Sequence, residues 1–141
     1  MRKVMWMGTF VVAGLMMVTG CAQQKRSAGK ATDGLNRIHF DFDKSNIKSE
    51  FEPVLRNNAA WLQAHSKKNV VVEGHCDERG SNEYNIALGE RRANAAKNYL
   101  KNLGVAANRM DSISYGEERP MATCHEESCW WQNRRAEFVA K

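Results

Sequence analysis

Hydrophobic and polar positions follow two different periods along the C-terminal three quarters of the chain. Apolar and polar residues alternate over residues 38–43, which predicts a half-buried strand. The apolar run of residues 70–72 predicts a short buried strand in a sheet with helices on one or both faces. Residues 112–115 predict a third strand, and after a loop over 116–132 the alternation of 136–140 predicts a last one.

Two stretches with helical spacing separate these strands. In the first, Ser49 and Glu52 predict a capping box, and Pro53 favours a helix start near Glu52. The second predicts a long helix over residues 83–103, which Gly104 ends as the residue after the cap. The order strand, helix, strand, helix, strand, loop, strand predicts an α+β fold. We expect a βαβαβ(β) two-layer sandwich with a mixed sheet of about four strands and two main helices.

One cation of the long helix falls on its apolar side. On a wheel of about 100° per residue, Arg92 lies between Leu88 and Leu103, whereas Arg91 lies outside the apolar arc. An unpaired buried charge costs several kcal/mol, so Arg92 needs a partner. Asp77, where the preceding strand gives way to a loop, is the candidate. The alternatives are that Arg92 extends to solvent or forms a purely structural ion pair.

The chain begins with the features of a secretory signal. Two cations precede the uncharged residues 4–18, a stretch that is too short for a membrane span of about 20 residues. Small residues then lead to Cys21 in the sequence Val-Thr-Gly-Cys, which resembles a bacterial lipobox. We therefore expect a signal peptide over residues 1–20 and lipidation of Cys21. The alternative is an ordinary signal peptide followed by a chance cysteine. Ala22, in place of Asp, implies sorting to the outer membrane by resemblance to bacterial lipoproteins.

The remaining chain divides into a tether and one domain. Residues 21–35 are almost free of apolar side chains beyond the cysteine, which predicts a flexible tether, and residues 36–141 suffice for one core. Without residues 1–20, the 21 Lys and Arg fall to 19 against 16 Asp and Glu, so the net charge falls from +5 to +3. This small, interspersed charge gives no argument for a nucleic-acid partner.

Four motifs resemble the OmpA-like C-terminal domain family over residues 36–141. They are His39-Phe40-Asp41-Phe42-Asp43-Lys44, Val72-Glu73-Gly74-His75-Cys76-Asp77-Glu78-Arg79-Gly80, Tyr84-Asn85-Ile86-Ala87-Leu88-Gly89-Glu90-Arg91-Arg92-Ala93 and Asn133-Arg134-Arg135. The resemblance implies a non-catalytic domain without a cofactor that binds peptidoglycan. It implies that Asp77 takes the ammonium and Arg92 the carboxylate of meso-diaminopimelate in the stem peptide. Four further residues would complete the pocket: Phe42, Asp43, Asn85 and Leu88.

The lipobox and this domain together imply an outer-membrane lipoprotein facing the periplasm, which anchors the membrane to the cell wall. In such lipoproteins a TolB-type protein of the Tol system docks beside the pocket that binds diaminopimelate. The Tol system serves envelope integrity and cell division. The resemblance places this partner face at four charged residues: Glu78, Arg79, Glu90 and Arg91. The alternative is an anchoring lipoprotein that works outside the Tol system.

Three further cysteines allow two kinds of chemistry. In an oxidising periplasm, Cys124 and Cys129 are close enough in sequence to close a small disulfide loop, which leaves Cys76 as a semi-buried thiol. The alternative is a periplasmic metal-binding protein with tetrahedral zinc. Its donors would come from five residues: His75, Cys76, Cys124, His125 and Cys129. The absence of a CxxC pair favours the disulfide.

A wall hydrolase is the remaining alternative. His75 and Asp77 could supply a general base pair. However, the sequence offers neither an assignable activated nucleophile nor a second carboxylate at glycosidase spacing. We therefore predict a binding module and not an enzyme.

Overall fold

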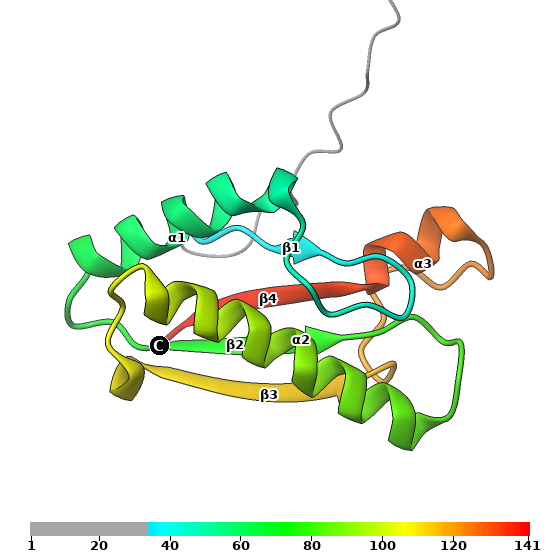
Figure 1. Cartoon of the computed structure of the whole chain (residues 1–141). Helices are drawn as coiled ribbons and strands as arrows, with labels where there is room; N and C mark the ends of the chain where they lie inside the picture. The colour runs from blue at the N-terminus through cyan, green and yellow to red at the C-terminus, as the bar shows by residue number, and fades with distance from the viewer. Residues whose placement is uncertain (1–33) are drawn as a thin grey trace, which may run out of the picture.

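The computed structural model describes residues 34–141 and shows one four-stranded mixed sheet with two long helices on one face (Figure 1). Its elements are β1 (Ile38–His39), a 3-10 turn (Ser49–Phe51), α1 (Glu52–Ala64), β2 (Val70–His75), α2 (Asn82–Asn102), a 3-10 turn (Ala107–Arg109), β3 (Met110–Gly116), α3 (Glu127–Asn133) and β4 (Arg135–Ala140). The strand order is β1-β4-β2-β3, with β2 and β3 parallel and β4 antiparallel to both of its neighbours. The predicted α+β sandwich is confirmed.

The predicted signal peptide, Cys21 and most of the tether lie outside the described residues. Leu35, which we assigned to the tether, is fully buried in the core and therefore belongs to the domain. None of the helices in residues 34–141 is long and apolar enough to cross a membrane.

The core lies between the sheet and its two long helices. Val70 and Val72 of β2 and Phe138 of β4 supply the sheet side, all with at most 1% of their surface exposed. The helices add a set of equally apolar side chains: Leu55, Ala59, Leu62, Ala93, Ala96 and Leu100. The opposite face of the sheet is open, because Ile113 on β3 is 42% exposed. Helices therefore cover one face of the sheet, which is one of the two arrangements that the sequence pattern allowed.

The first strand is shorter than its alternation predicted. Within residues 38–43, only Ile38 and His39 pair with β4. Phe40 still donates its backbone N–H to the Arg134 carbonyl (3.0 Å). The chain then turns at Asp43, whose φ of +54° lies in the left-handed region that Asp tolerates. This turn leaves Phe42 54% exposed at the end of the sheet.

Two other local predictions were also wrong. Ser49 forms a 3-10 turn instead of a capping box, and α1 has no side-chain cap. The predicted helix start near Glu52 is nevertheless confirmed, with a proline in the first turn. The predicted loop over residues 116–132 contains the start of the short helix α3. By contrast, the end of α2 is confirmed, since Gly104 follows the cap with a φ of +95°.

A contact between two glycines sets the position of α2 on the sheet. A Cβ added to Gly74 of β2 would lie 1.8 Å from the carbonyl oxygen of Gly89 on α2. Only glycine allows the helix and strand backbones to approach this closely. The approach places the first half of α2 directly beside the carboxyl end of β2, where the pocket forms.

Candidate functional site

A pocket of about 180 Å³ opens where β2 ends and α2 begins. Its walls come from the turn after β1, the loop after β2 and the first three turns of α2. All six residues that we predicted for the pocket line it: Phe42, Asp43, Asp77, Asn85, Leu88 and Arg92. Four others complete the lining: Cys76, Arg79, Gly80 and Tyr84. The structure thus brings the predicted set together, and its role in binding stays a prediction.

Asp77 is the buried anion of this pocket. Arg79 donates from its backbone N–H (3.1 Å) and Nε (3.1 Å) to Oδ1, and from Nη2 (2.6 Å) to Oδ2. Arg134 donates from Nη1 to Oδ2 (3.2 Å). Burial alone would raise the pKa of Asp77, but the hydrogen bonds from the two arginines outweigh it and hold the pKa below its usual value. Asp77 is therefore ionised at neutral pH.

Arg92 confirms the anomaly on the helical wheel but not its expected partner. Its side chain is fully buried, so the solvent-exposed alternative was wrong. The guanidinium donates to the carbonyls of Lys44 (2.9 Å), His75 (2.9 Å) and Asp41 (3.1 Å). The direct ion pair with Asp77 was therefore also wrong, because backbone carbonyls surround the guanidinium and Asp77 pairs with other arginines. A guanidinium has five N–H donors, so three carbonyls do not exhaust it.

Arg79 forms one wall of the pocket instead of lying freely on its rim. Its guanidinium lies between the rings of Phe42 (3.9 Å to the centroid) and Trp130 (4.2 Å). Glu127 of α3 lies 3.8 Å from its Nη2. These contacts leave the Arg79 side chain 30% exposed, and its assignment to the partner face stays a prediction.

The helix side of the pocket is held by Asn85 and Leu88. Asn85 donates from Nδ2 to the carbonyls of Asp77 (3.2 Å) and Arg79 (3.1 Å), which fixes the loop between β2 and α2. Leu88 is 5% exposed and supplies an apolar floor. At the mouth, the Tyr84 hydroxyl donates to Asp43, so the turn after β1 is tied to α2.

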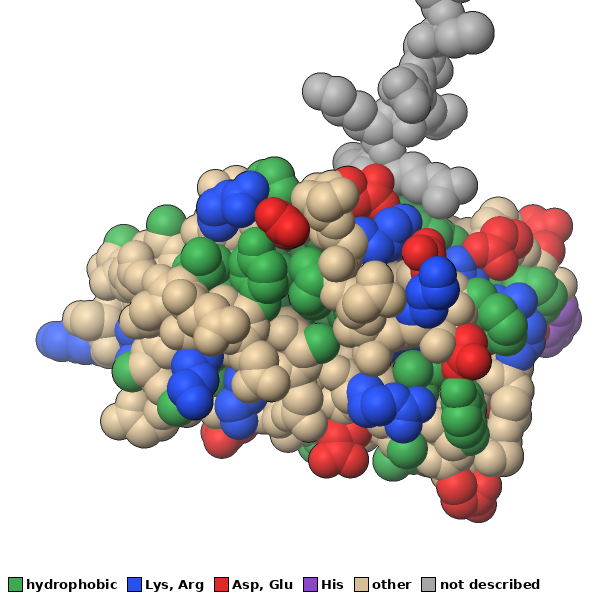
Figure 2. All heavy atoms as spheres, in the orientation of Figure 1, with side chains coloured by type: hydrophobic (Ala, Val, Ile, Leu, Met, Phe, Trp, Pro, Cys, Tyr) green, Lys and Arg blue, Asp and Glu red, His purple; other side chains and the backbone are tan. Residues whose placement is uncertain are grey.

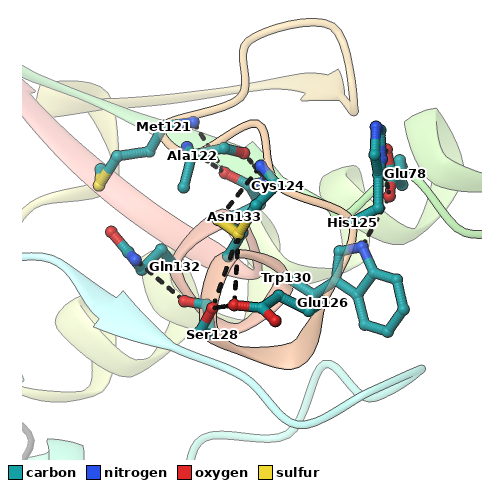
Figure 3. The surroundings of a disulfide bond; sticks show 11 residues. Glu78, Met121, Ala122, Cys124, His125, Glu126, Ser128, Trp130, Gln132 and Asn133 are labelled. Carbon is teal, nitrogen blue, oxygen red and sulfur yellow. Dashed lines mark hydrogen bonds and ion pairs between the residues drawn. A yellow bond between two sulfur atoms is a disulfide. The ribbon is translucent and has the colours of Figure 1, made fainter.

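A disulfide between Cys124 and Cys129 closes the loop before α3, as predicted (Figure 3). Figure 3 shows Trp130 and His125 directed toward Glu78, with Trp130 Nε1 and His125 Nδ1 each 2.8 Å from its carboxylate. The zinc donors predicted as an alternative do not converge. Cys124 and Cys129 are bonded to each other, and His125 pairs with Glu78.

The third cysteine, Cys76, is a buried thiol at the base of the pocket. It is 2% exposed, and its Sγ donates to the carbonyl of Asn85 (3.2 Å). Burial raises the pKa of this thiol to about 11, so it is protonated and unreactive at neutral pH.

His75 lies under the open face of the sheet, away from this pocket. It is 1% exposed, and neither of its ring nitrogens has a hydrogen-bond partner. Burial lowers its pKa to about 3. Its ring nitrogens and the carboxylates of Glu73 and Glu137 have ligand atoms within 4.8 Å of one another. However, Arg135 (2.8 Å) and Arg37 (3.5 Å) already contact one oxygen of Glu137, so arginines supply the positive charge there.

The other predicted partner-face residues lie beside the pocket. Glu78, Glu90 and Arg91 are exposed, and the Arg91 guanidinium lies 5.7 Å from the ring centroid of Tyr84 at the pocket mouth. Cations and anions are interspersed over the face shown in Figure 2. The surface next to the pocket therefore carries charges of both signs.

Sequence reasoning missed Arg134 as a part of this site. Arg134 is 4% exposed and donates to the Phe40 carbonyl (3.0 Å), to Asp77 (3.2 Å) and to Glu127. It stands in the Asn133-Arg134-Arg135 run, but the run alone does not indicate which of its arginines turns inward. Arg135, its neighbour, instead pairs with Glu137 on the other side of β4.

A mixed four-stranded sheet with two helices on one face and a charged pocket at the end of its central strand β2 defines an OmpA-like domain. Residues 39–134 match the OmpA family, and the chain belongs to this family.

Individual relatives and solved structures give a more specific similarity than the family match does. The chain is 43% identical to the peptidoglycan-associated lipoprotein of Mesorhizobium japonicum over 89% of this chain and 86% of that one. A crystal structure of the peptidoglycan-associated lipoprotein from Burkholderia pseudomallei superposes with a TM-score of 0.73 at 39% identity, covering 74% of this chain and 89% of the other. The cell wall anchor of the T6SS from Pseudomonas aeruginosa superposes with a TM-score of 0.63 at 27% identity, covering 73% and 77%.

Proposed function

We propose that this protein binds peptidoglycan non-covalently and anchors the outer membrane to the cell wall. Its similarity to peptidoglycan-associated lipoproteins and to a cell wall anchor supports this function. The observation that carries it is the pocket, in which a buried carboxylate and a buried guanidinium line one small cavity. Such a pair suits a ligand that carries both an ammonium and a carboxylate.

In this proposal the ligand is the zwitterionic end of meso-diaminopimelate in the stem peptide. Asp77 accepts hydrogen bonds from the ammonium. Arg92 donates to the carboxylate from an N–H that is not bonded to a backbone carbonyl. Leu88 and the exposed ring of Phe42 contact the aliphatic part of the side chain. Reversible binding is enough for this role, and the protein does no chemistry on the wall.

The anchor at the other end of the chain is the lipid on Cys21. Two or three acyl chains hold a protein in a bilayer, because each buried CH₂ adds about 0.8 kcal/mol. Ala22 after the modified cysteine supports sorting to the outer membrane, with the domain in the periplasm.

Cosedimentation with purified sacculi tests this function. Asp77→Ala should weaken binding by about 2–5 kcal/mol, because the arginines that face the carboxylate lose their partner. Asp111→Ala is the matched control, since Asp111 is an exposed aspartate on β3 outside the pocket lining. If Asp77→Ala sediments with sacculi as well as the wild type does, the assignment of the pocket is wrong.

The same surface supports membership of the Tol-Pal system. Glu90 and Arg91 are exposed, and Arg91 lies over Tyr84 at the pocket mouth, so a protein docked there would cover the pocket. A TolB-type periplasmic protein and the stem peptide should therefore compete. Exposed charges of this kind mainly set encounter rates and partner choice. A titration in which saturating peptide leaves the affinity for the TolB-type protein unchanged would contradict a shared site, and no binding would favour anchoring outside the Tol system.

A further inference from the structure

The carboxylate of Asp77 has no acceptor position to spare. Its two oxygens receive four N–H groups: the backbone N–H, Nε and Nη2 of Arg79, and Nη1 of Arg134. A carboxylate offers about four lone-pair positions, so these donors fill it. A ligand ammonium that donates to Asp77 must therefore replace one of them.

Two of the four donors are fixed, the backbone N–H of Arg79 and Nη1 of Arg134. Arg134 is 4% exposed and is held by the Phe40 carbonyl (3.0 Å) and by Glu127, so its guanidinium cannot turn away without leaving buried bonds unmade. The backbone N–H of Arg79 lies in a loop whose carbonyl is bound by Asn85 (3.1 Å). Only the side chain of Arg79, 30% exposed at the pocket wall, can move.

Arg79 also has a place to go. Its guanidinium is stacked between Phe42 and Trp130, so a small rotation away from Asp77 keeps it against both rings. Glu127, at 3.8 Å and 61% exposed, is an alternative acceptor for the same guanidinium. Trp130 is itself held by Glu78, and the disulfide closes the loop that leads into α3, so this receiving surface is rigid.

We propose that Arg79 is the resident cation of Asp77, and that a ligand ammonium binds by exchange with this guanidinium. The proposal rests on the function proposed above and adds a selectivity to it. A simple amine only replaces one cation on Asp77 by another. A zwitterionic ligand gains a further interaction, because its carboxylate meets Arg92. Because the exchange lowers the affinity for every amine, only a ligand whose carboxylate also reaches Arg92, such as the free amino-acid end of diaminopimelate, binds well.

Calorimetric titration of the full chain in detergent tests the exchange, with a tripeptide ending in meso-diaminopimelate and with 1,5-diaminopentane as probes. Arg79→Ala should bind the tripeptide at least about fivefold more tightly, because no resident cation has to leave. Its affinity for the diamine should rise by a similar factor, because displacing Arg79 costs both ligands the same, so the ratio of the two affinities, which Arg92 sets, should stay unchanged. Arg56→Ala, which removes an exposed arginine of α1 paired with Glu52, is the matched control. Arg79→Gln repeats the test with a side chain that keeps the turn polar.

Tryptophan fluorescence reports the movement of the Arg79 side chain itself. Tripeptide binding should change the tryptophan emission of the wild type, because Arg79 shifts against Trp130, and this change should be lost in Arg79→Ala and in Trp130→Phe. If Arg79→Ala and Arg79→Gln weaken tripeptide binding while Asp77→Ala also weakens it, Arg79 is a direct ligand contact and the exchange is wrong, whereas the proposed function stands. If Asp77→Ala binds the tripeptide like the wild type, the proposed function itself fails.

Discussion

Replacing Arg92 by methionine would show how much the fold depends on one buried cation. Methionine is long, unbranched and apolar, so it can occupy much of the same space. The change removes the donors to the carbonyls of Asp41, Lys44 and His75, all between 2.9 and 3.1 Å from the guanidinium. These carbonyls belong to the turn after β1 and to the end of β2, so the guanidinium joins the two segments to α2.

The magnitude follows from what each carbonyl can do afterwards. Lys44 is exposed and Asp41 is half-buried, so water can reach their carbonyls in part. His75 is 1% exposed, so its carbonyl is left without a partner at a cost of about 1–3 kcal/mol. Hydrogen bonds to charged groups contribute about 1.5–3 kcal/mol each, and the loss is offset because methionine has no charge to desolvate. We expect a net loss of about 2–4 kcal/mol, a large part of a typical domain stability of about 5–15 kcal/mol.

Urea unfolding followed by circular dichroism measures this loss from the midpoint at constant slope. The control is Arg91→Met, the exposed neighbour on the same helix, which should change stability by less than about 0.5 kcal/mol. Equal midpoints for the two variants, or a loss below about 1 kcal/mol for Arg92→Met, would refute the claim that this guanidinium holds the pocket walls together.

Three further predictions concern the disulfide, the buried imidazole and the glycine contact. Replacing both Cys124 and Cys129 by serine should lower stability by about 2 kcal/mol, and alkylation of the denatured, unreduced wild type should label neither of them. Burial lowers the pKa of His75 to about 3, so the unfolded chain takes up this proton near pH 6.5, before the folded chain does. Stability should therefore fall as the pH drops from 6.5 toward 3, by up to about 1.4 kcal/mol per unit, and His75→Gln should flatten that part of a urea-midpoint profile. Gly74→Ala should cost several kcal/mol or prevent folding, because its Cβ would meet the Gly89 carbonyl at 1.8 Å, and an unchanged midpoint would contradict the close approach.

Periodicity along the sequence determined most of the architecture. The alternation at 136–140 and the apolar run at 70–72 became strands β4 and β2, and the long amphipathic stretch became α2 within one residue at each end. The wheel also identified Arg92 as a cation on an apolar face, which burial confirms. These results share one physical basis. The period of a single element decides which of its side chains face the core, whatever lies opposite.

The tertiary structure alone decided which charges meet. The sequence suggested Asp77 as the partner of Arg92, but Asp77 binds Arg134 from 57 residues away, and Arg92 binds the carbonyls of segments 17, 48 and 51 residues away. Such partners depend on how β4 and the turn after β1 come together, and no local period encodes that distance. The short β1 has a local cause instead, because the chain turns at Asp43 and leaves β4 although the polar alternation continues. Local patterns therefore place a side chain on a face, while the packing of distant segments decides what it touches there.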